Sequence, residues 1–265
     1  MSVTSASSQA HQTEPGDHHV QSFARGLAVI RSFHARAPQQ SITEVAAATG
    51  LTRAGARRIL LTLLGLGYVE QDGRQFRLTA KVLDLGYAYL TSLPTWSLAE
   101  PVLEALVRKV HESSSVAVLD GADVVYVLRI PTQKIMTLNL AVGSRLPSHC
   151  TSLGRVLLAC LPPDRRDTAL AASVQAHPDF PASRDLAVLR AQLDTVRQQG
   201  WALVDEELES GLISLAAPLR NARGQTVAAV NLSSHRSRTT AAEMVGTLLP
   251  DLLRAADEIS QGIRP

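Results

Sequence analysis

The amino-acid sequence predicts an α+β protein built in two parts, and three observations support this prediction. With 265 residues, of which 45% are hydrophobic and 19% charged, the chain is long enough for one large or two modest domains. Residues 20–80 show helical periodicity followed by a strand–turn–strand pattern. Residues 96–265 instead mix strand-like and helix-like stretches, as expected for a sheet covered by helices.

Two further segments complete the predicted domain organisation. Residues 1–19 are rich in Ser, Thr, Gln and His and lack an apolar stretch, so we expect a disordered tail and not a signal peptide. Residues 81–95 carry a helical pattern that ends near Pro94, and we expect them to form a linker helix between the two parts.

Three helices are predicted at the start of the first part. Apolar residues recur at helical spacing over residues 22–35. Ser41, followed three residues later by Glu44, has the pattern of a capping box that opens a second helix. Thr52 is in the position of an N-cap for a third helix, over residues 53–66.

A β-hairpin is predicted directly after the third helix. Residues 68–70 and 75–78 favour short strands, and the sequence QDGR between them contains the Asp-Gly pair typical of a hairpin turn. Three helices followed by a hairpin within roughly 60 residues are typical of a winged helix-turn-helix.

The third helix is predicted to carry a cationic face opposite an apolar one. At about 100° per residue, Arg53, Arg57 and Arg58 gather on one side and most of the leucines on the other. The arginines lie in the N-terminal half of the helix, where the dipole already favours anions, so phosphate groups would complete this surface. Residues 20–81 also hold nine Lys or Arg but three acidic residues. The alternative is a basic face that contacts only solvent.

Together these features predict binding to double-stranded DNA. The third helix is expected to enter the major groove, while helix N-termini and the hairpin contact the backbone. The predicted DNA-binding residues are Arg25, Ser41, Thr52, Arg53, Arg57, Arg58, Arg74 and Arg77. Two such domains on a homodimer predict a pseudo-palindromic operator.

The second part is expected to form a sheet domain of the α+β class. Strands are predicted at residues 116–119, 124–130, 135–141, 213–219 and 226–232, and helices at residues 97–112, 150–161, 186–200 and 240–263.

The chain resembles the IclR family of bacterial transcriptional regulators in the stretches SFARGLAVIRSF, ITEVAAATGLTRAGARRILLTLLGLGYVEQDGRQFRLT, GSRLPSHCTSLGRVLLA and GWALVDEELESGLISLAAPLRNARG. The resemblance extends from about Val20 to the C-terminus, and VDEELESGLISLAAPL is its most specific part. It implies a winged helix-turn-helix, a linker helix and a GAF-like α/β effector-binding domain. It also implies a homodimer, or a tetramer that is a dimer of dimers.

One branch of that family is more similar. The stretches LTRAGARRILLTLLGLGYV, LTAKVLDLGYAYL, VHESSSVAVLDG and SHCTSLGRVLLACLP resemble the Pca and Pob regulators of protocatechuate, 4-hydroxybenzoate and β-ketoadipate metabolism. This implies a small aromatic acid, or the carboxylate derived from it by ring cleavage, as the effector. The alternative is a regulator of another small-carboxylate or sugar-acid pathway.

Two positions depart from the common family pattern. Val204 stands where an acidic residue or Ser is usual, and Ser214 stands where Cys is common. Both lie near where family members hold small carboxylates, so the ligand is expected to differ from that of the glyoxylate-shunt regulators.

A candidate effector site begins at the sequence SHCTSLGR. His149, Thr151 and Ser152 lie just before or at a helix start, where free backbone N–H groups can meet a carboxylate. The alternative for Thr151 or Ser152 is simple N-capping of that helix, and one residue can do both.

Four more residues are candidate ligand contacts. Asn139 and Asn231 lie within apolar strands, where Asn is disfavoured and therefore needs a partner: effector, backbone or water. Arg129 could bind a carboxylate in a bidentate manner, or form a structural ion pair. Ser214 is a lining position implied by the resemblance, with core filling as the alternative.

Catalysis is not expected. His149 beside Cys150 suggests a base and a thiol nucleophile, but adjacent residues rarely reach the required geometry and no third orienting group is apparent. The rival functions are an enzyme of aromatic-acid metabolism with a basic accessory domain, and a DNA-binding protein without an effector.

No metal ion or cofactor is expected, and the cytoplasm is the expected location. The possible metal ligands His11, Asp17, His18 and His19 lie in the tail, where we expect them to be solvated. The two cysteines do not form a CxxC motif, which favours a reducing compartment. No apolar run approaches the roughly 20 residues that a membrane span needs.

Overall fold

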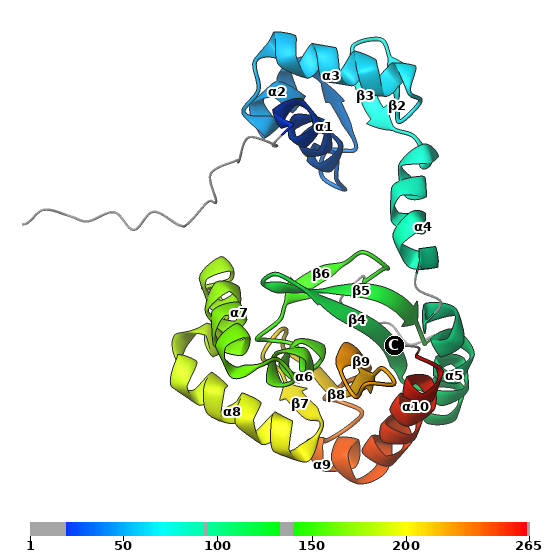
Figure 1. The fold of residues 1–265 in the computed structure, drawn as a ribbon, viewed down its shortest axis with the longest axis vertical. Helices are drawn as coiled ribbons and strands as arrows, with labels where there is room; N and C mark the ends of the chain where they lie inside the picture. The colour runs from blue at the N-terminus through cyan, green and yellow to red at the C-terminus, as the bar shows by residue number, and fades with distance from the viewer. Residues whose placement is uncertain (1–19, 93–94, 133–139, 264–265) are drawn as a thin grey trace, which may run out of the picture. The chain divides into compact units, whose positions relative to one another are not determined.

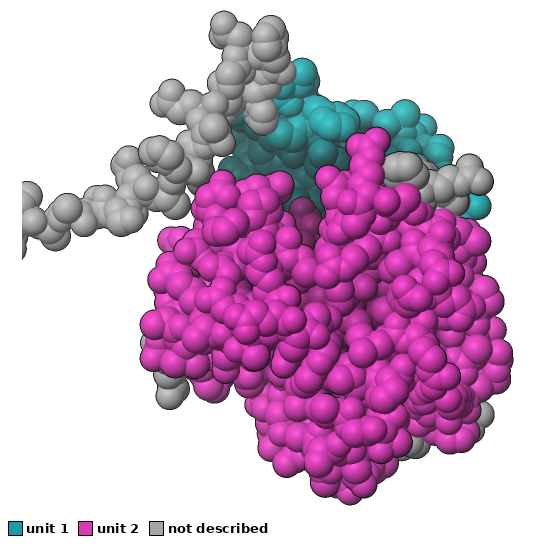
Figure 2. Space-filling model, turned by 60° about the horizontal axis from the view of Figure 1, so that its bottom comes forward, with its two compact units in different colours: residues 1–89 teal, residues 90–265 magenta. Residues whose placement is uncertain are grey.

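The computed structural model describes residues 20–92, 95–132 and 140–263. The chain divides into two compact units, Met1–Tyr89 (unit 1) and Leu90–Pro265 (unit 2), which Figure 2 shows in different colours. Each unit has its own hydrophobic core. No helix in the described part of the chain is long and apolar enough to cross a lipid bilayer.

Unit 1 is a winged helix-turn-helix, as predicted (Figure 1). Its elements are α1 (Gln21–Ser32), β1 (Gln39–Ser41), α2 (Ile42–Thr49), α3 (Arg53–Gly65), β2 (Val69–Asp72) and β3 (Gln75–Leu78). The three strands form an antiparallel sheet in the order β1-β3-β2. Val29, Val45 and Leu60 from the three helices pack with Phe76 of the hairpin, and all four are buried.

Local hydrogen bonds set the helix starts at the predicted places. The Ser41 backbone N–H donates to Glu44 Oε2 at 2.7 Å, and Ser41 Oγ accepts from the Glu44 N–H at 3.4 Å, which completes the capping box. Thr52 Oγ1 accepts from the Gly55 N–H at 3.1 Å and caps α3. Gly50 ends α2 with a φ of 67°, a left-handed conformation that glycine adopts without strain.

Unit 1 differs from the prediction between α1 and α2. Helix α1 ends at Ser32 instead of residue 35, because the backbone turns to form an isolated bridge between His34 and Ala37. Strand β1 then pairs with β3 and was not predicted, since three residues are too few to show an alternating pattern.

The predicted linker helix is present but begins later than expected. A 3₁₀ turn (Ala80–Val82) follows β3, and α4 (Leu83–Ser92) follows the turn. Thr79 Oγ1 accepts from the Lys81 N–H at 3.3 Å and caps the 3₁₀ turn.

Unit 2 is built on a six-stranded antiparallel sheet in the order β6-β5-β4-β9-β8-β7 (Figure 1). The strands are β4 (Ser113–Asp120), β5 (Asp123–Ile130), β6 (Arg145–Pro147), β7 (Ala202–Asp205), β8 (Leu212–Arg220) and β9 (Thr226–His235). One face is covered by α5 (Thr95–Val110) and α10 (Leu249–Gly262). The other face carries α6 (Ser152–Ala159), with α7 (Pro163–Ala176) and α8 (Leu186–Gln199) packed outside it.

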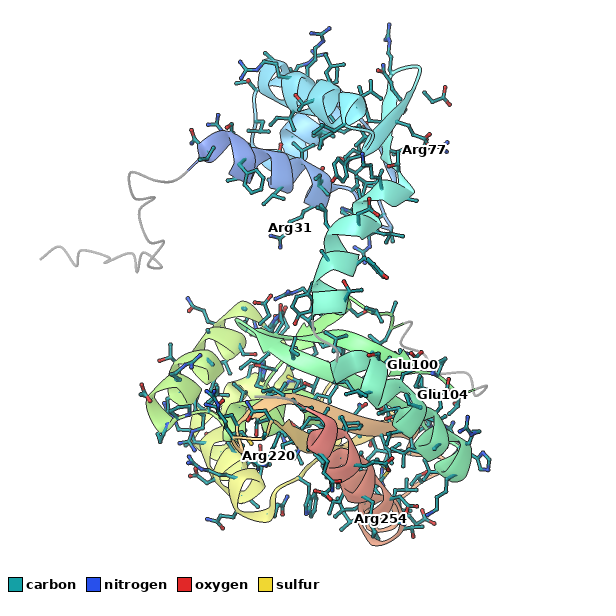
Figure 3. The ribbon with its side chains drawn as sticks, turned by 45° about the vertical axis from the view of Figure 1, so that its right-hand side comes forward. Arg31, Arg77, Glu100, Glu104, Arg220 and Arg254 are labelled. Atoms are coloured by element: carbon teal, nitrogen blue, oxygen red, sulfur yellow. The ribbon has the colours of Figure 1, made fainter. Side chains whose placement is uncertain are left out.

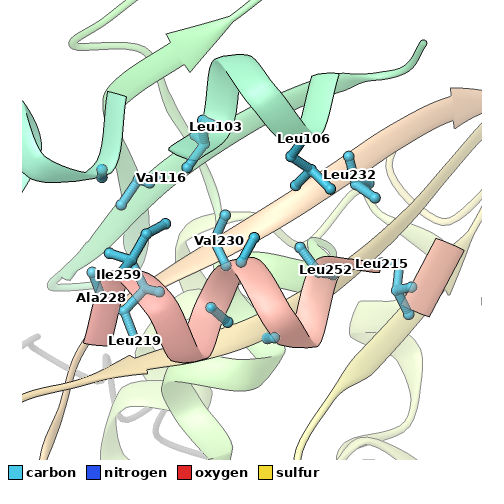
Figure 4. Packing of buried hydrophobic residues seen from close by; sticks show 14 of the residues in the cluster. Leu103, Leu106, Val116, Leu215, Leu219, Ala228, Val230, Leu232, Leu252 and Ile259 are labelled. Carbon is cyan, nitrogen blue, oxygen red and sulfur yellow. The ribbon is translucent and has the colours of Figure 1, made fainter. Parts of the chain in front are cut away.

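The two faces of the sheet differ in side-chain size. Leu103 of α5, Val230 of β9 and Leu252 of α10 belong to a large aliphatic core (Figure 4). On the opposite face the strands present small residues, including Ala117 and Ala229, which allow α6 to approach the sheet closely.

Several elements of unit 2 were not predicted. Strands β6 and β7 have three and four residues, too few for a periodic signal. Helix α7 is mostly polar and has only a weak apolar stripe. The strand predicted at residues 135–141 falls mainly on residues 133–139, which lie outside the described residues, and residues 140–141 are not in a strand.

The predicted C-terminal helix is interrupted. It consists of a short helix α9 (Ala241–Glu243), a π-helical turn (Met244–Leu248) and α10. Pro250 has no N–H to donate to the carbonyl four residues before it, and Leu249 instead donates to the Met244 carbonyl with π-helical spacing.

Candidate nucleic-acid interface and ligand cavity

Helix α3 has the two opposed faces that its sequence predicts. Ala56, Leu60 and Leu63 are buried in the core of unit 1. Arg53, Arg57 and Arg58 are exposed on the helix surface. A cationic surface therefore stands on a helix whose inner side is fixed by packing.

The arginines of this surface have few protein partners. In the part of the chain that the structure describes, no carboxylate pairs with the side chains of Arg25, Arg53, Arg57, Arg58 or Arg74. Arg77, which projects from β3 in Figure 3, instead forms an ion pair with Glu70 across the hairpin. Five of the six predicted cationic contacts are thus available to an external anion.

The two predicted hydroxyl contacts are occupied only in part. Ser41 Oγ and Thr52 Oγ1 each accept a hydrogen bond from a helix N–H, as N-caps do. The hydroxyl proton of each remains free to donate to a phosphate oxygen.

An apolar groove of about 610 Å³ runs beside α1 in unit 1. It is lined by Val20, Ser22, Phe23, Gly26, Leu27, Ile30, Arg58, Ile59, Thr62, Leu63, Leu66, Tyr68 and Leu85. Leu66 was predicted on the buried side of α3, but it is 54% exposed and lines this groove. Phe23, on α1, is 68% exposed, so unit 1 alone leaves a large apolar surface in contact with water.

Unit 2 contains a small cavity between the N-terminus of α6 and the sheet. Its volume is about 20 Å³, which is room for one water molecule. The described residues that line it are Tyr126, Arg129, Leu140, Leu146, Cys150, Thr151, Ser152, Leu153, Val204, Leu208, Leu212, Ser214, Asn231 and Ser233.

The fold brings together five of the seven predicted ligand contacts at this cavity, namely Arg129, Thr151, Ser152, Ser214 and Asn231. It does not bring His149 there, and Asn139 lies outside the described residues.

At the start of α6, the hydroxyl of Thr151 is hydrogen-bonded and the hydroxyl of Ser152 has no partner among the described residues. Thr151 Oγ1 accepts from the Gly154 N–H and donates to the Pro147 carbonyl, both at 3.1 Å, so Thr151 is the N-cap. Ser152 is 1% exposed, and its Oγ has no hydrogen-bond partner among the described residues. A buried hydroxyl without a partner costs about 1–3 kcal/mol, which a ligand oxygen would recover.

A close backbone contact positions this helix start. A Cβ atom on Gly154 would lie 2.0 Å from the Ser148 carbonyl oxygen. Only glycine therefore allows α6 to pack against the segment that precedes it. The sequence analysis did not identify Gly154, because this contact is visible only in the folded chain.

His149 has a structural role that the sequence analysis did not foresee. Its ring lies between Ser173 of α7 and Ser183, with both nitrogens 2.8 Å from a serine Oγ. Ser183 Oγ donates to the His177 carbonyl, so it must accept from His149 Nε2–H, and Nδ1 then accepts from Ser173. Burial, followed by the nearby charges of His177 and Arg155, lowers the pKa of His149 to about 4. His149 is therefore neutral, and its ring joins Ser173 to Ser183 instead of lining the cavity.

The sheet side of the cavity is partly satisfied by the protein itself. Asn231 Oδ1 accepts from the Ser115 N–H at 2.9 Å, and Asn231 Nδ2 donates to Ser233 Oγ at 2.9 Å. Arg129 Nη1 lies 3.4 Å from Ser115 Oγ and has no carboxylate partner among the described residues. Asn231 thus has the structural partners that a strand Asn needs, whereas no carboxylate of the described residues neutralises the Arg129 charge.

A β-bulge adds a residue that sequence reasoning missed. The register between β4 and β5 shifts at Val116 and Ala117, so Tyr126 pairs with Ala117 while Arg129 pairs with Ser115. Residues three apart in a regular strand point to opposite faces, but the bulge turns Tyr126 and Arg129 to the same face. Burial raises the pKa of Tyr126 to about 12, so its hydroxyl stays protonated.

The loop between β7 and β8 contributes to the wall of the cavity. Arg155 is 3% exposed, donates from Nε to the His149 carbonyl at 2.9 Å, and pairs with Glu207 in this loop. The next residue, Leu208, lines the cavity. The ion pair therefore connects α6 with the loop that contributes Leu208 to the cavity, and it was not predicted because its partners are 52 residues apart.

The arrangement does not support thiol catalysis. Burial raises the pKa of Cys150 to about 12, which keeps the thiol protonated. Both ring nitrogens of His149 are already hydrogen-bonded to serines. Among the described residues no group of three His, Cys, Asp or Glu side chains could hold a metal ion.

Comparison with known families identifies the chain. The family model "Bacterial transcriptional regulator IclR C-terminal" matches residues 87–261, and the model "IclR helix-turn-helix domain" matches residues 22–73. The protein belongs to the IclR family. It is a DNA-binding transcriptional regulator and not an enzyme, in agreement with the sequence analysis.

Individual relatives support this identification. The chain is 42% identical to the "Pca regulon regulatory protein" of Pseudomonas putida, over 90% of this chain and 82% of the relative. It is 28% identical to an IclR family transcriptional regulator from Brucella abortus, with a TM-score of 0.78 over 96% of this chain and 97% of that structure. The PobR inducer-binding domain from Acinetobacter, a double mutant in complex with 3-hydroxybenzoic acid, is 30% identical with a TM-score of 0.54. That match covers 62% of this chain and 97% of the PobR domain.

Proposed function

We propose that this IclR-family protein controls genes of aromatic-acid breakdown, binding operator DNA as a homodimer through α3 and binding a small carboxylate in the unit 2 cavity. It works in the bacterial cytoplasm, where its operator is. The observation that carries the effector half of the proposal is the buried hydroxyl of Ser152, which lacks a partner and lies at the N-terminus of a helix. The helix dipole and free N–H groups favour an anion at that point.

The DNA half rests on the unpaired arginines of unit 1. Arg53, Arg57 and Arg58 enter the major groove with α3, where a guanidinium can pair with guanine or with phosphate. Arg25 and Arg74 contact the backbone from either side, and Ser41 and Thr52 donate to phosphates. Arg77 contributes less, because Glu70 already neutralises it.

The homodimer is supported by the apolar groove of unit 1. Phe23 lines the groove and is 68% exposed, so a twofold pairing of two copies would bury this apolar surface on both. Paired heads then contact two half-sites of a pseudo-palindromic operator. Effector binding in unit 2 changes the spacing of the heads through α4, and pairing of two dimers gives the alternative tetramer.

The aromatic class of effector is supported by two relatives. One is named for the Pca regulon, and the other binds 3-hydroxybenzoic acid. The carboxylate accepts from Ser152 and the first backbone N–H groups of α6, and Arg129 adds positive charge from the sheet. The cavity of about 20 Å³ must enlarge to take an aromatic ring, and the loop joined to α6 by the Arg155–Glu207 pair is one part of its wall without ladder hydrogen bonds.

The DNA half is tested with Arg57→Ala in salt titrations of operator binding. Loss of a guanine contact costs about 1–3 kcal/mol on the specific site alone. Loss of a phosphate contact weakens all sequences and lowers the salt slope by about one. The matched control is Arg31→Ala, which removes the same charge from an exposed site on α1 (Figure 3). Equal binding by wild type and Arg57→Ala at low salt contradicts the assignment.

The effector half is tested by calorimetry and thermal shift with benzoate, 4-hydroxybenzoate, protocatechuate and β-ketoadipate. A bound acid raises the unfolding temperature by mass action. Ser152→Ala removes a hydrogen bond to a charged group and should weaken the best of these acids by about tenfold or more. If none of the acids binds the wild type, the effector assignment is wrong, and the DNA half stands on its own test.

A further inference from the structure

Helix α3 presents a small apolar side chain among the arginines of its exposed face. Ala54 is exposed, and so are Arg57 and Arg58, which follow it by three and four residues. Residues at these two spacings are neighbours on a helix surface, with Cβ atoms roughly 5–6 Å apart. Ala54 does not line the apolar groove beside α1. Its methyl group is therefore open to the same partner that the arginines bind.

The position of Ala54 on the helix directs it away from the core of unit 1. Measured from Arg53 at about 100° per residue, the three buried residues of α3 centre on about 310°. The opposite direction, about 130°, falls between Ala54 at about 100° and Arg58 at about 140°. When α3 lies in the major groove, Ala54 therefore faces the edges of the bases, and longer arginine side chains extend on either side of it.

Leu61 continues the apolar surface along α3. It lies two turns after Ala54 at nearly the same angle and is 39% exposed. The two residues are separated by roughly 10 Å along the helix axis. Recognition helices contact base edges with their N-terminal residues. Ala54, in the first turn of α3, is thus the residue of this apolar surface that is placed to reach a base.

A methyl group in the major groove complements one feature of the base edges. Guanine, adenine and cytosine present hydrogen-bonding atoms there, whereas thymine also presents its C5 methyl group. Packing Ala54 against a donor or acceptor would remove that group from water without giving it a partner. Packing Ala54 against the thymine methyl removes apolar surface of both groups from water, which is favourable.

We propose that Ala54 is a specificity-determining residue that selects a thymine in each operator half-site by contact with its C5 methyl group. This inference rests on the proposed entry of α3 into the major groove and adds the choice of one base to it. Because Arg57 and Arg58 are neighbours of Ala54 on the helix, the thymine lies next to the bases or phosphates that these arginines bind.

Replacement of thymine by deoxyuridine tests this inference, because it removes only the C5 methyl group. A duplex that the full chain binds tightly is first selected from random sequences, and each of its thymines is then replaced in turn. We expect one thymine in each half-site at which deoxyuridine weakens binding about fourfold, as the loss of one buried methyl group predicts. In Ala54→Gly this penalty should disappear at that thymine. The lower helix propensity of glycine affects both duplexes alike and cancels in their ratio.

Ala28→Gly is the matched control, since it makes the same change at an exposed position of α1. It should leave the penalty at every thymine unchanged. Selected duplexes that share no thymine, or binding that is insensitive to deoxyuridine at every thymine, overturn the inference. A fourfold penalty that persists in Ala54→Gly also overturns it.

The Arg57→Ala titration separates these outcomes from failure of the proposed function. If Arg57→Ala weakens binding while no thymine depends on Ala54, α3 contacts the DNA and the thymine contact alone is wrong. If Arg57→Ala binds as wild type does at low salt, the proposed entry of α3 into the groove is wrong, and the thymine contact is wrong with it.

Discussion

The arginine surface of α3 and the cavity beneath α6 both hold polar groups without partners in the described chain, but one set is charged and exposed while the other is uncharged and buried. Exposed guanidinium groups remain solvated by water, so leaving them without a protein partner costs little folding free energy. They are therefore available to bind a polyanion such as DNA. The hydroxyl of Ser152 is removed from water and has no hydrogen-bond partner among the described residues, so it costs free energy until another group bonds to it. The difference predicts a DNA contact that is sensitive to salt, and an effector contact that is nearly independent of salt.

The largest expected effect is a loss of stability in unit 2, which disturbs the cavity beneath α6 and leaves the arginine surface of α3 intact. Gly154→Ala adds a Cβ atom 2.0 Å from the Ser148 carbonyl oxygen, a contact that requires the backbone to shift. In a helix this substitution normally stabilises, but here we expect unit 2 to lose about 3 kcal/mol or more of unfolding free energy. Denaturant unfolding followed in unit 2 measures the loss.

Gly86→Ala in α4 is the control, because nothing lies within 4 Å of its added Cβ. It should leave the stability of unit 2 unchanged. Wild-type stability in Gly154→Ala would show that α6 can move away from Ser148 without cost, and that the cavity is not rigidly built.

The next largest effect is a dependence of the unfolding free energy on pH, and it arises from His149, which precedes α6. The pKa of His149 falls from about 6.5 in the unfolded chain to about 4 in the folded protein, so the unfolded state binds the proton first. Stability from neutral His149 is full above pH 6.5 and is lost as the pH falls towards 4. The loss attributable to this residue is at most about 3 kcal/mol.

His149→Gln has no proton to gain in this range and should flatten that part of the profile. The measurement is the unfolding free energy of wild type and variant between pH 7 and pH 4. Parallel profiles would contradict the depressed pKa and the neutral serine-bound state of His149.

The smallest expected effect concerns the arginine surface of unit 1. Glu70→Gln breaks the surface ion pair with Arg77, in which both side chains are about half exposed. Stability should change by less than about 1 kcal/mol. Arg77 then joins the free arginines, so DNA binding should strengthen at low salt and the salt slope should steepen by up to about one. An unchanged slope would place Arg77 outside the interface.

The exposed surface could be predicted almost completely from the sequence, because its determinants are local. The caps at Ser41 and Thr52, the Asp-Gly turn and the angular spacing of Arg53 and Arg57 each depend on residues within one or two turns. Leu66 is the exception on this unit. Its helical position predicts burial, yet the monomer leaves it beside the groove.

The cavity could be predicted only in part. Polar residues in apolar strands and at a helix start indicated Arg129, Ser214, Asn231 and Ser152, and the fold does bring them together. Tyr126 was missed because a bulge changes the face to which it points, and a bulge depends on pairing between strands. The Gly154 contact and the Arg155–Glu207 pair were missed for the same reason, since both depend on tertiary contacts. His149 was expected at the ligand and instead supports the segment before it.

The small volume of the cavity beneath α6 has a consequence for the rate of ligand exchange. Under the proposed function, a space that fits one water molecule must enlarge before an aromatic acid enters it, so protein motion and not diffusion sets the rate of exchange. The same barrier acts on departure. An acid bound in the proposed way would therefore remain bound through brief falls in its concentration, and transcription would follow its average supply.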